Sequence, residues 1–149
     1  MLFRSGGISP RGAIEAFVVD DRAQESARQF RWNGSGRGDA QIWGSAVDLT
    51  RQSNGEMALS FRYRVDARPT SSVSLNLQGG AVDMTSIFNS APVGEWQAVK
   101  IRLSCFGEAG ANLGNVETPF QLATVGAFTV SVSEVRLASN ENDTVCPAR

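Results

Sequence analysis

The sequence contains no histidine among its 149 residues. This absence excludes Ser-His-Asp and Cys-His catalysis and histidine-ligated metal centres, because each of them needs an imidazole. No apolar run approaches the ~20 residues that span a bilayer, and Met1–Pro10 lacks the basic and apolar regions of a secretory signal. The chain also lacks a large net charge, since its 14 basic and 15 acidic residues give a net charge of −1. We therefore expect neither a nucleic-acid nor a membrane partner.

Cysteine is scarce, with only Cys105 and Cys146 in the chain. Two thiols without histidine cannot complete a four-ligand zinc site. If they pair, they close a loop of about 41 residues, worth about 4 kcal/mol in the chain-entropy model. In a reducing compartment they would stay free thiols, so the predicted disulfide depends on export.

Alternation of apolar and polar residues dominates what remains. This period of two is typical of a strand with one buried and one solvated face. A change of phase late in the chain predicts a β-bulge near Ser133 and Glu134. The expected strands are 13–19, 28–32, 41–49 with a break near Gly44, 57–65, 72–78, 97–103 and 128–137.

Only residues 85–89 and 107–113 could form short helices between these strands. Short strands separated by turn-rich segments predict an all-β fold, a β-sandwich or jelly roll of two antiparallel sheets. We place a flexible leader at residues 1–12, the sandwich at 13–138 and a loose tail at 139–149.

Paired carboxylates are the remaining catalytic option, because a glycosidase needs only two. The predicted strands carry Arg, Lys, Ser and Asn on their outward faces, so we expect no enzyme activity. Acidic residues at strand ends either stay solvated or hold calcium. Asp20 and Asp21 are the first candidates for a structural calcium site, followed by Asp39 and Asp48. No other cofactor is predicted.

Carbohydrate recognition combines an aromatic ring that stacks on a sugar with polar side chains that bind its hydroxyls. Trp43 follows Ile42, so the two side chains point to opposite faces of a strand, and Trp43 is exposed if Ile42 is buried. Trp43 then either stacks on a sugar or packs under a loop. Trp96 opens a strand and is either a rim-packing residue or a stacking platform. The parity of the strands places the other aromatic candidates in the core, namely Phe30, Trp32, Phe61 and Tyr63.

If strands 57–65, 72–78 and 97–103 are neighbours, their outward residues form one polar surface. That surface either binds a sugar or is an ordinary solvated sheet face. The predicted carbohydrate-binding residues are Trp43, Arg62, Arg64, Asn76, Gln78, Trp96, Lys100 and Arg102.

Residues 20–34, DDRAQESARQFRWNG, form the most specific segment of the chain. The segment resembles the C-terminal sandwich domain of bacterial exo-acting glucan β-glucosidases of glycoside hydrolase family 3. In that domain D-x-x-x-Q-E-D-A-R is followed by W-x-G, and here Ser26 stands where an Asp is usual. Residues 82–85, 96–106, 119–122 and 128–137 are also similar, so the resemblance covers about residues 13–138.

The resemblance implies a galactose-binding-like jelly roll. The catalytic residues of that family lie in upstream domains, which are not part of this sequence. The resemblance also implies a non-catalytic carbohydrate-binding module that holds β-glucan or a related plant polysaccharide, such as cellulose or xylan, for a parent glycosidase. A structural module that packs on or dimerises the parent glucosidase is the alternative. Export would be encoded on the parent chain, so we expect a secreted or periplasmic bacterial enzyme.

Overall fold

The chain folds into two stacked β-sheets in a computed structural model that describes residues 2–3, 8–21, 24–139 and 143–148. For residues 2–3, 20–21 and 24–26 it describes the backbone alone. The seven-stranded sheet has the order β12 (Thr144–Val145), β9 (Trp96–Arg102), β6 (Ala58–Ala67), β11 (Ala127–Ala138), β4 (Gln24–Asn33) and β3 (Ile14–Asp21), with β1 (Leu2–Phe3) beside β11. The five-stranded sheet has the order β2 (Ser9–Gly12), β5 (Gly38–Ile42), β10 (Phe120–Thr124), β7 (Ser74–Leu77) and β8 (Gly80–Asp83).

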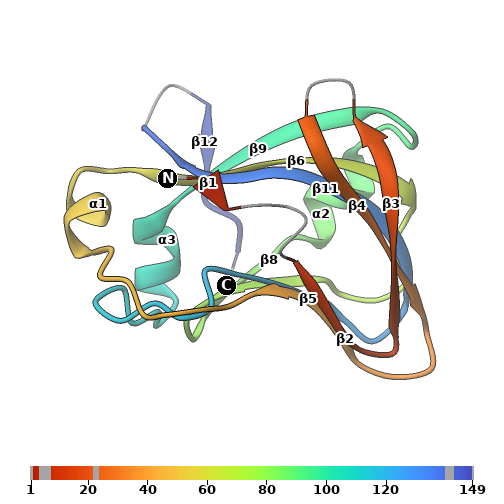
Figure 1. The fold of residues 1–149 in the computed structure, drawn as a ribbon, viewed down its shortest axis with the longest axis horizontal. Helices are drawn as coiled ribbons and strands as arrows, with labels where there is room; N and C mark the ends of the chain where they lie inside the picture. The colour runs from red at the N-terminus through yellow and green to blue at the C-terminus, as the bar shows by residue number, and fades with distance from the viewer. Residues whose placement is uncertain (1, 4–7, 22–23, 140–142, 149) are drawn as a thin grey trace.

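These two layers confirm the predicted all-β sandwich. In Figure 1, β6, β9 and β11 run along one side of the molecule, and β2, β5 and β8 lie on the other. Every pair of neighbouring strands among the described residues is antiparallel, except the parallel pair β9 and β12.

The core lies between the sheets, where the alternation of each strand directs its apolar residues. In β6, Phe61 and Tyr63 are buried, whereas Arg62 and Arg64, which alternate with them, are only half-buried. Phe61 meets Phe120 of the opposite sheet edge-to-face, with 5.3 Å between ring centroids. Burying a side chain of this size stabilises a fold by about 1.5–3 kcal/mol, so contacts of this kind hold the layers together.

The predicted bulge is present in β11. Its pairing with β6 is regular from Val130 to Ser133, which lies opposite Arg62, and resumes at Arg136, opposite Ser60. Glu134 takes a positive φ of 53° at this point. The extra residue shifts the phase of the strand, so that Val132 and Val135 are both buried.

Three short helices complete the described part of the chain: α1 (Thr50–Asn54), α2 (Thr85–Ser90) and α3 (Leu103–Glu108). The predicted helix at 85–89 is confirmed. The one expected at 107–113 is wrong, because the helix begins at Leu103 and the chain reaches a positive φ of 106° at Gly110. Figure 1 shows α1 and α3 together at one end of the sandwich. No described helix is long and apolar enough to cross a bilayer.

Both terminal segments contribute strands that the sequence did not indicate. Residues 9–12, expected within a flexible leader, pair with β5. In the expected loose tail, Thr144–Val145 pairs with β9, and the Ala148 carbonyl accepts a hydrogen bond from the Asp83 N–H at 2.6 Å. The tail thus connects the edges of both sheets. These contacts are made by backbone hydrogen bonds, which do not depend on the side chains. The sequence of these segments therefore shows no alternation of apolar and polar residues.

Candidate functional site

Five of the predicted carbohydrate-binding residues share the outward face of the seven-stranded sheet. The register of β6 and β9 pairs Arg64 with Trp96, and residues two apart along each strand repeat this orientation. The five are Arg62, Arg64, Trp96, Lys100 and Arg102.

Two of these arginines already have partners on the protein. Arg64 Nε donates to Asp66 Oδ1 at 2.6 Å, and Arg62 Nε lies 3.9 Å from Glu134 Oε2. Their guanidinium carbons lie over the Trp96 ring, 5.3 and 5.1 Å from its centroid. This cation–π arrangement occupies the ring surface that a sugar would need. Trp96, half-buried, is therefore a packing residue of this sheet.

Asn76 and Gln78 do not lie on this surface, so the expectation of one continuous face is wrong. Asn76 belongs to β7, whose neighbours are β8 and β10 in the five-stranded sheet. The chain leaves the seven-stranded sheet after β6 and returns only at β9. Alternation gives the face of a residue within its strand but does not say to which sheet the strand belongs.

Gln78 has a structural role at the turn after β7, where its φ is 45°. Its side-chain Oε1 accepts hydrogen bonds from the Glu117 and Thr118 N–H groups at 2.7 and 3.0 Å. Asn76 Oδ1 similarly accepts from the Gly79 N–H at 2.9 Å. The amide nitrogen of Asn76 is the group that remains for a ligand.

The outward face of the five-stranded sheet carries a row of amide side chains. Gln121 in β10 lies opposite Gln41 in β5 on one side and Asn76 in β7 on the other. Leu122, next along β10, is fully buried in the core, so the row points away from it. Gln121 and Asn76 are half-buried and Gln41 is more deeply covered. Amides both donate and accept hydrogen bonds, as binding of sugar hydroxyls requires.

The next row of this face is centred on Asp39, whose side chain is 7% exposed. Gln121 Nε2 donates to Asp39 Oδ2 at 2.7 Å. Arg11 Nε and one terminal nitrogen of Arg37 lie 4.0 and 3.9 Å from the carboxylate, and both arginine side chains are more than 60% exposed (64% and 62%). The covered carboxylate therefore holds two accessible guanidinium groups at the surface.

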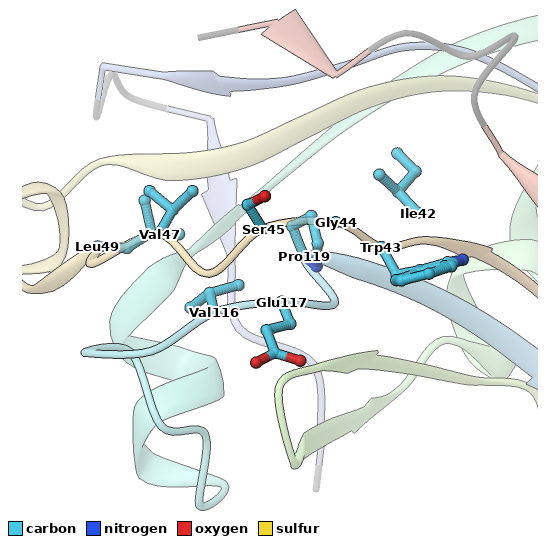
Figure 2. Close-up of a pocket in the computed structure, with 9 residues that line it drawn as sticks. All are labelled: Ile42, Trp43, Gly44, Ser45, Val47, Leu49, Val116, Glu117 and Pro119. Atoms are coloured by element: carbon cyan, nitrogen blue, oxygen red, sulfur yellow. The ribbon is translucent and has the colours of Figure 1, made fainter.

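Trp43 extends this face beyond the end of β5. It is 68% exposed, which confirms the predicted exposure. Figure 2 shows Ile42 and Trp43 on opposite sides of the chain, Ile42 toward the other sheet. The Gly44 N–H donates to the Glu117 carbonyl at 2.9 Å, so the pairing of β5 with β10 continues past Ile42 and supports the indole.

Two depressions lie along the same face and its end. Beside Trp43 is a pocket of about 190 Å³, lined by Ile42, Trp43, Gly44, Ser45, Val47, Leu49, Val116, Glu117 and Pro119 (Figure 2). A second, of about 310 Å³, has Arg37, Ser74 and Asp83 among its lining residues. Four residues of extended chain separate Asp39 from Trp43, about 13 Å. The face is therefore long enough for more than one sugar ring.

The carboxylates of this face are not arranged for hydrolysis. Asp39 and Asp83 lie in one row but three strands apart, about 14 Å at 4.8 Å per strand. Catalytic pairs in glycosidases are separated by about 5–9.5 Å. Asp83 Oδ1 also accepts a hydrogen bond from the Thr85 N–H at 2.9 Å. Asp39 and Asp83 are therefore too far apart to act as a catalytic pair.

The calcium prediction stays a prediction. The side chains of Asp20 and Asp21 lie outside the described residues, and Asp39 is paired as above. Hydrogen bonds from the Thr50 hydroxyl and backbone N–H lower the pKa of the exposed Asp48. Within the described ranges, no three metal-binding side chains form a group.

The sequence interpretation named Asp39 only as a calcium candidate, and it missed Arg11, Arg37, Gln41 and Gln121. Asp39 and Gln41 do alternate with Ala40 and Ile42, which is a strand signal. The signal is short, and it does not indicate that β10 lies beside β5. Cys105 and Cys146, which the sequence left as a disulfide or two free thiols, form a disulfide with 5.7 Å between their Cα atoms.

No curated protein matches the sequence. Among solved structures, the extra C-terminal domain of the exo-1,3/1,4-β-glucanase from a Pseudoalteromonas species is similar, with 15% identity and a TM-score of 0.66 over 97% of this chain and 84% of that one. The whole glucanase gives 14% identity and a TM-score of 0.67 over 94% of this chain, which spans 18% of the enzyme's length. The family 30 carbohydrate-binding module of a Clostridium thermocellum cellulosomal cellulase gives 17% identity and 0.66 over 93% and 94%.

These likenesses show the fold of the chain, a β-sandwich shared with those two domains. A family model described as Exop_C, galactose-binding domain-like, matches residues 4–137. The match confirms the galactose-binding-like fold that the segment 20–34 implied. The chain belongs to this galactose-binding domain-like family.

Proposed function

We propose that this domain is a non-catalytic carbohydrate-binding module for β-glucan or a related plant polysaccharide, accessory to a glycoside hydrolase. The observation that carries the proposal is Trp43, an exposed indole at the end of a sheet face lined with amides and guanidinium groups. An aromatic ring exposed beside hydrogen-bonding groups suits a ligand that is apolar on its ring faces and polar at its edges.

The similar proteins support the choice of polysaccharide. One is a domain of an exo-1,3/1,4-β-glucanase, and another is the binding module of a cellulase. We also propose that the parent chain is a secreted or periplasmic bacterial enzyme. The disulfide between Cys105 and Cys146 suits that compartment.

Substitution of Trp43 tests the proposal. In affinity electrophoresis or calorimetry with soluble β-glucan, xylan and cello-oligosaccharides, Trp43→Ala should lose about 1–3 kcal/mol of binding free energy, as expected for loss of one stacking residue. The fold should persist, because the ring is exposed. Trp96→Ala is the matched control, since it removes an indole from the other sheet and should leave binding unchanged.

If the wild-type protein binds none of these glycans, the proposal fails. If Trp96→Ala abolishes binding while Trp43→Ala does not, the sugar site lies on the seven-stranded sheet instead. Circular dichroism of each variant separates loss of binding from loss of fold.

A structural module remains the second candidate, and one observation favours it. The chain spans 18% of the length of the glucanase it resembles, where it is one part of a larger molecule. A domain of this kind would pack on or dimerise its parent glucosidase without affinity for free sugar. Sedimentation over a range of concentrations would then report self-association in place of glycan binding.

A further inference from the structure

The seven-stranded sheet has a charged surface that the proposed sugar site does not use. All charged side chains of β6, β9 and β11 point outward from this sheet. The cationic ones are Arg62, Arg64, Lys100, Arg102 and Arg136, and the acidic ones are Asp66 and Glu134. The surface as a whole therefore carries a positive charge, on a chain whose net charge is −1.

The two carboxylates of these strands both lie at one end of the surface. Asp66 accepts from Arg64 at 2.6 Å, and Glu134 lies 3.9 Å from Arg62. At the other end, Arg102 donates to the neutral Thr144 hydroxyl at 3.1 Å. In the part of the chain that the structure describes, no carboxylate pairs with Arg102 or Arg136.

At the end of the surface near Arg102 and Arg136, the strand register places cationic side chains on either side of small residues. Arg136, Ser60 and Lys100 form one row across β11, β6 and β9, and Ala58 with Arg102 begins the next row. Ala58 and Ser60 are small and buried, at 0% and 6% exposure. The long cationic side chains on either side therefore rise above the middle strand. We name these five residues the basic strip.

The width of the basic strip restricts what can occupy it. The strands that carry the cations lie about 10 Å apart, twice the spacing of neighbouring strands. A typical protein interface covers about 800 Å² on each partner, so it would extend over the end where Asp66 and Glu134 cancel the charge. An extended polymer needs only the strip itself.

An extended acidic peptide fits less well than a sugar polymer. Peptides that bind to sheets do so by adding a strand at an edge. The edge of β9 is already paired with β12, which is fixed by the disulfide at Cys146. A polymer that lies across the face meets side chains alone, and guanidinium groups bind carboxylate or sulfate oxygens through paired N–H donors.

We propose that the basic strip is a second binding site, for an anionic polysaccharide that carries carboxylate or sulfate groups. The site lies on the sheet opposite to Trp43, so it is independent of the proposed neutral glycan site. Attraction to exposed cations weakens as salt screens them, which gives the two sites different signatures.

The test is affinity electrophoresis of the 149-residue protein in gels containing polygalacturonate, dextran sulfate, dextran or poly-L-glutamate, at low and high ionic strength. The double variant Arg102→Gln/Arg136→Gln is compared with Arg51→Gln/Arg68→Gln, which removes the same charge from α1 and from the loop after β6. At about 0.5 kcal/mol for each exposed ion pair, the strip variant should bind the anionic polysaccharides about fivefold more weakly. Arg102→Lys/Arg136→Lys, which keeps the charge, should retain part of the affinity.

Salt-dependent binding to polygalacturonate or dextran sulfate that falls in the strip variant alone would support the site, and the polymer bound identifies the group recognised. Trp43→Ala should not change it, so failure here is distinct from failure of the neutral glycan site. Absence of binding to both anionic polysaccharides, or equal binding by the strip variant and wild type, overturns the proposal. Equal binding of poly-L-glutamate also overturns it, because the surface would then recognise acidic polypeptide.

Discussion

The three tryptophans differ in what surrounds each indole. Trp32 is 2% exposed, stacks on Phe128 with 5.3 Å between centroids, and donates its Nε1–H to the Gly38 carbonyl at 2.7 Å. Trp96 is covered by arginines. Trp43 has neither a ring nor a cation over it among the described residues. Only the last environment leaves an aromatic surface open to a ligand.

Trp32→Ala should destabilise the fold by about 3–5 kcal/mol, because it removes a large buried ring and leaves a cavity. The Gly38 carbonyl would also lose its hydrogen bond. Urea denaturation followed by circular dichroism measures the change. Trp43→Ala is the control and should move the midpoint little; a larger loss from Trp43→Ala than from Trp32→Ala would show that the two environments have been reversed.

Tyr63 provides a test by pH, because it is the single tyrosine of the chain. Burial raises its pKa from the ordinary value of 10.0. The folded state therefore holds the phenol proton more tightly than the unfolded chain does. The free energy of unfolding keeps its full contribution from the protonated Tyr63 below pH 10.0 and loses it as the pH rises through the folded-state pKa.

Phenolate absorbance should thus appear at a higher pH in the native protein than in the same protein unfolded in urea. Tyr63→Phe should remove the signal and flatten the loss of stability in this alkaline range. Ionisation of native Tyr63 at the same pH as the unfolded chain would contradict the burial described for it.

At the scale of elements, the strands with sustained alternation were predictable, whereas β2, β10 and β12 were not. Residues 57–65 and 97–103 alternate over their whole length, because one face meets the core and the other meets water. β10 has four buried residues of five, with Ala123 and Thr124 covered by neighbouring segments. Burial on both faces removes the alternation, so the sequence pattern gave no strand there.

The carboxyl-terminal segment shows a second reason for failure. β12 is two residues long and has no pattern of its own. It is held in place by pairing with β9 and by the Cys105–Cys146 disulfide, which joins residues 41 positions apart. The cysteines were the single feature of this segment from which its attachment could be predicted.

Removing this covalent link should destabilise the fold. Cys105→Ser/Cys146→Ser opens a loop of 41 residues, and the chain-entropy model gives a loss of about 4 kcal/mol. Urea denaturation of the variant and of the reduced wild type should give the same shift of midpoint. Unchanged stability in both would mean that the tail contributes nothing to the fold. Glycan binding at Trp43 should survive reduction, because the disulfide joins α3 to the segment after β12.

For the molecule as a whole, the site could be predicted only in part. The exposure of Trp43 was predicted from its place next to Ile42, which is partly buried against the core. The partners of Trp43 did not follow, since Gln41, Gln121 and Asn76 come together only when β5, β10 and β7 pair. Alternation assigns a side chain to one face of a strand, whereas a binding site needs the order of strands within a sheet.

The two sheets present surfaces of different character. The five-stranded sheet offers an exposed indole, amides and two arginines held by a covered carboxylate. The seven-stranded sheet offers arginines packed on Trp96 at one end and the basic strip at the other. A neutral sugar chain and an anionic one would accordingly meet opposite sides of the domain.

The most direct measurement of the central claim is a chemical-shift map of backbone amides as a cello-oligosaccharide or soluble β-glucan fragment is added. The account predicts that the shifted signals cluster on the five-stranded sheet, around residues 39–44, 74–76 and 121–123, and include the Trp43 indole. Shifts that cluster around Arg62, Arg64 and Trp96 instead, or no shifts with any neutral glycan, would contradict it.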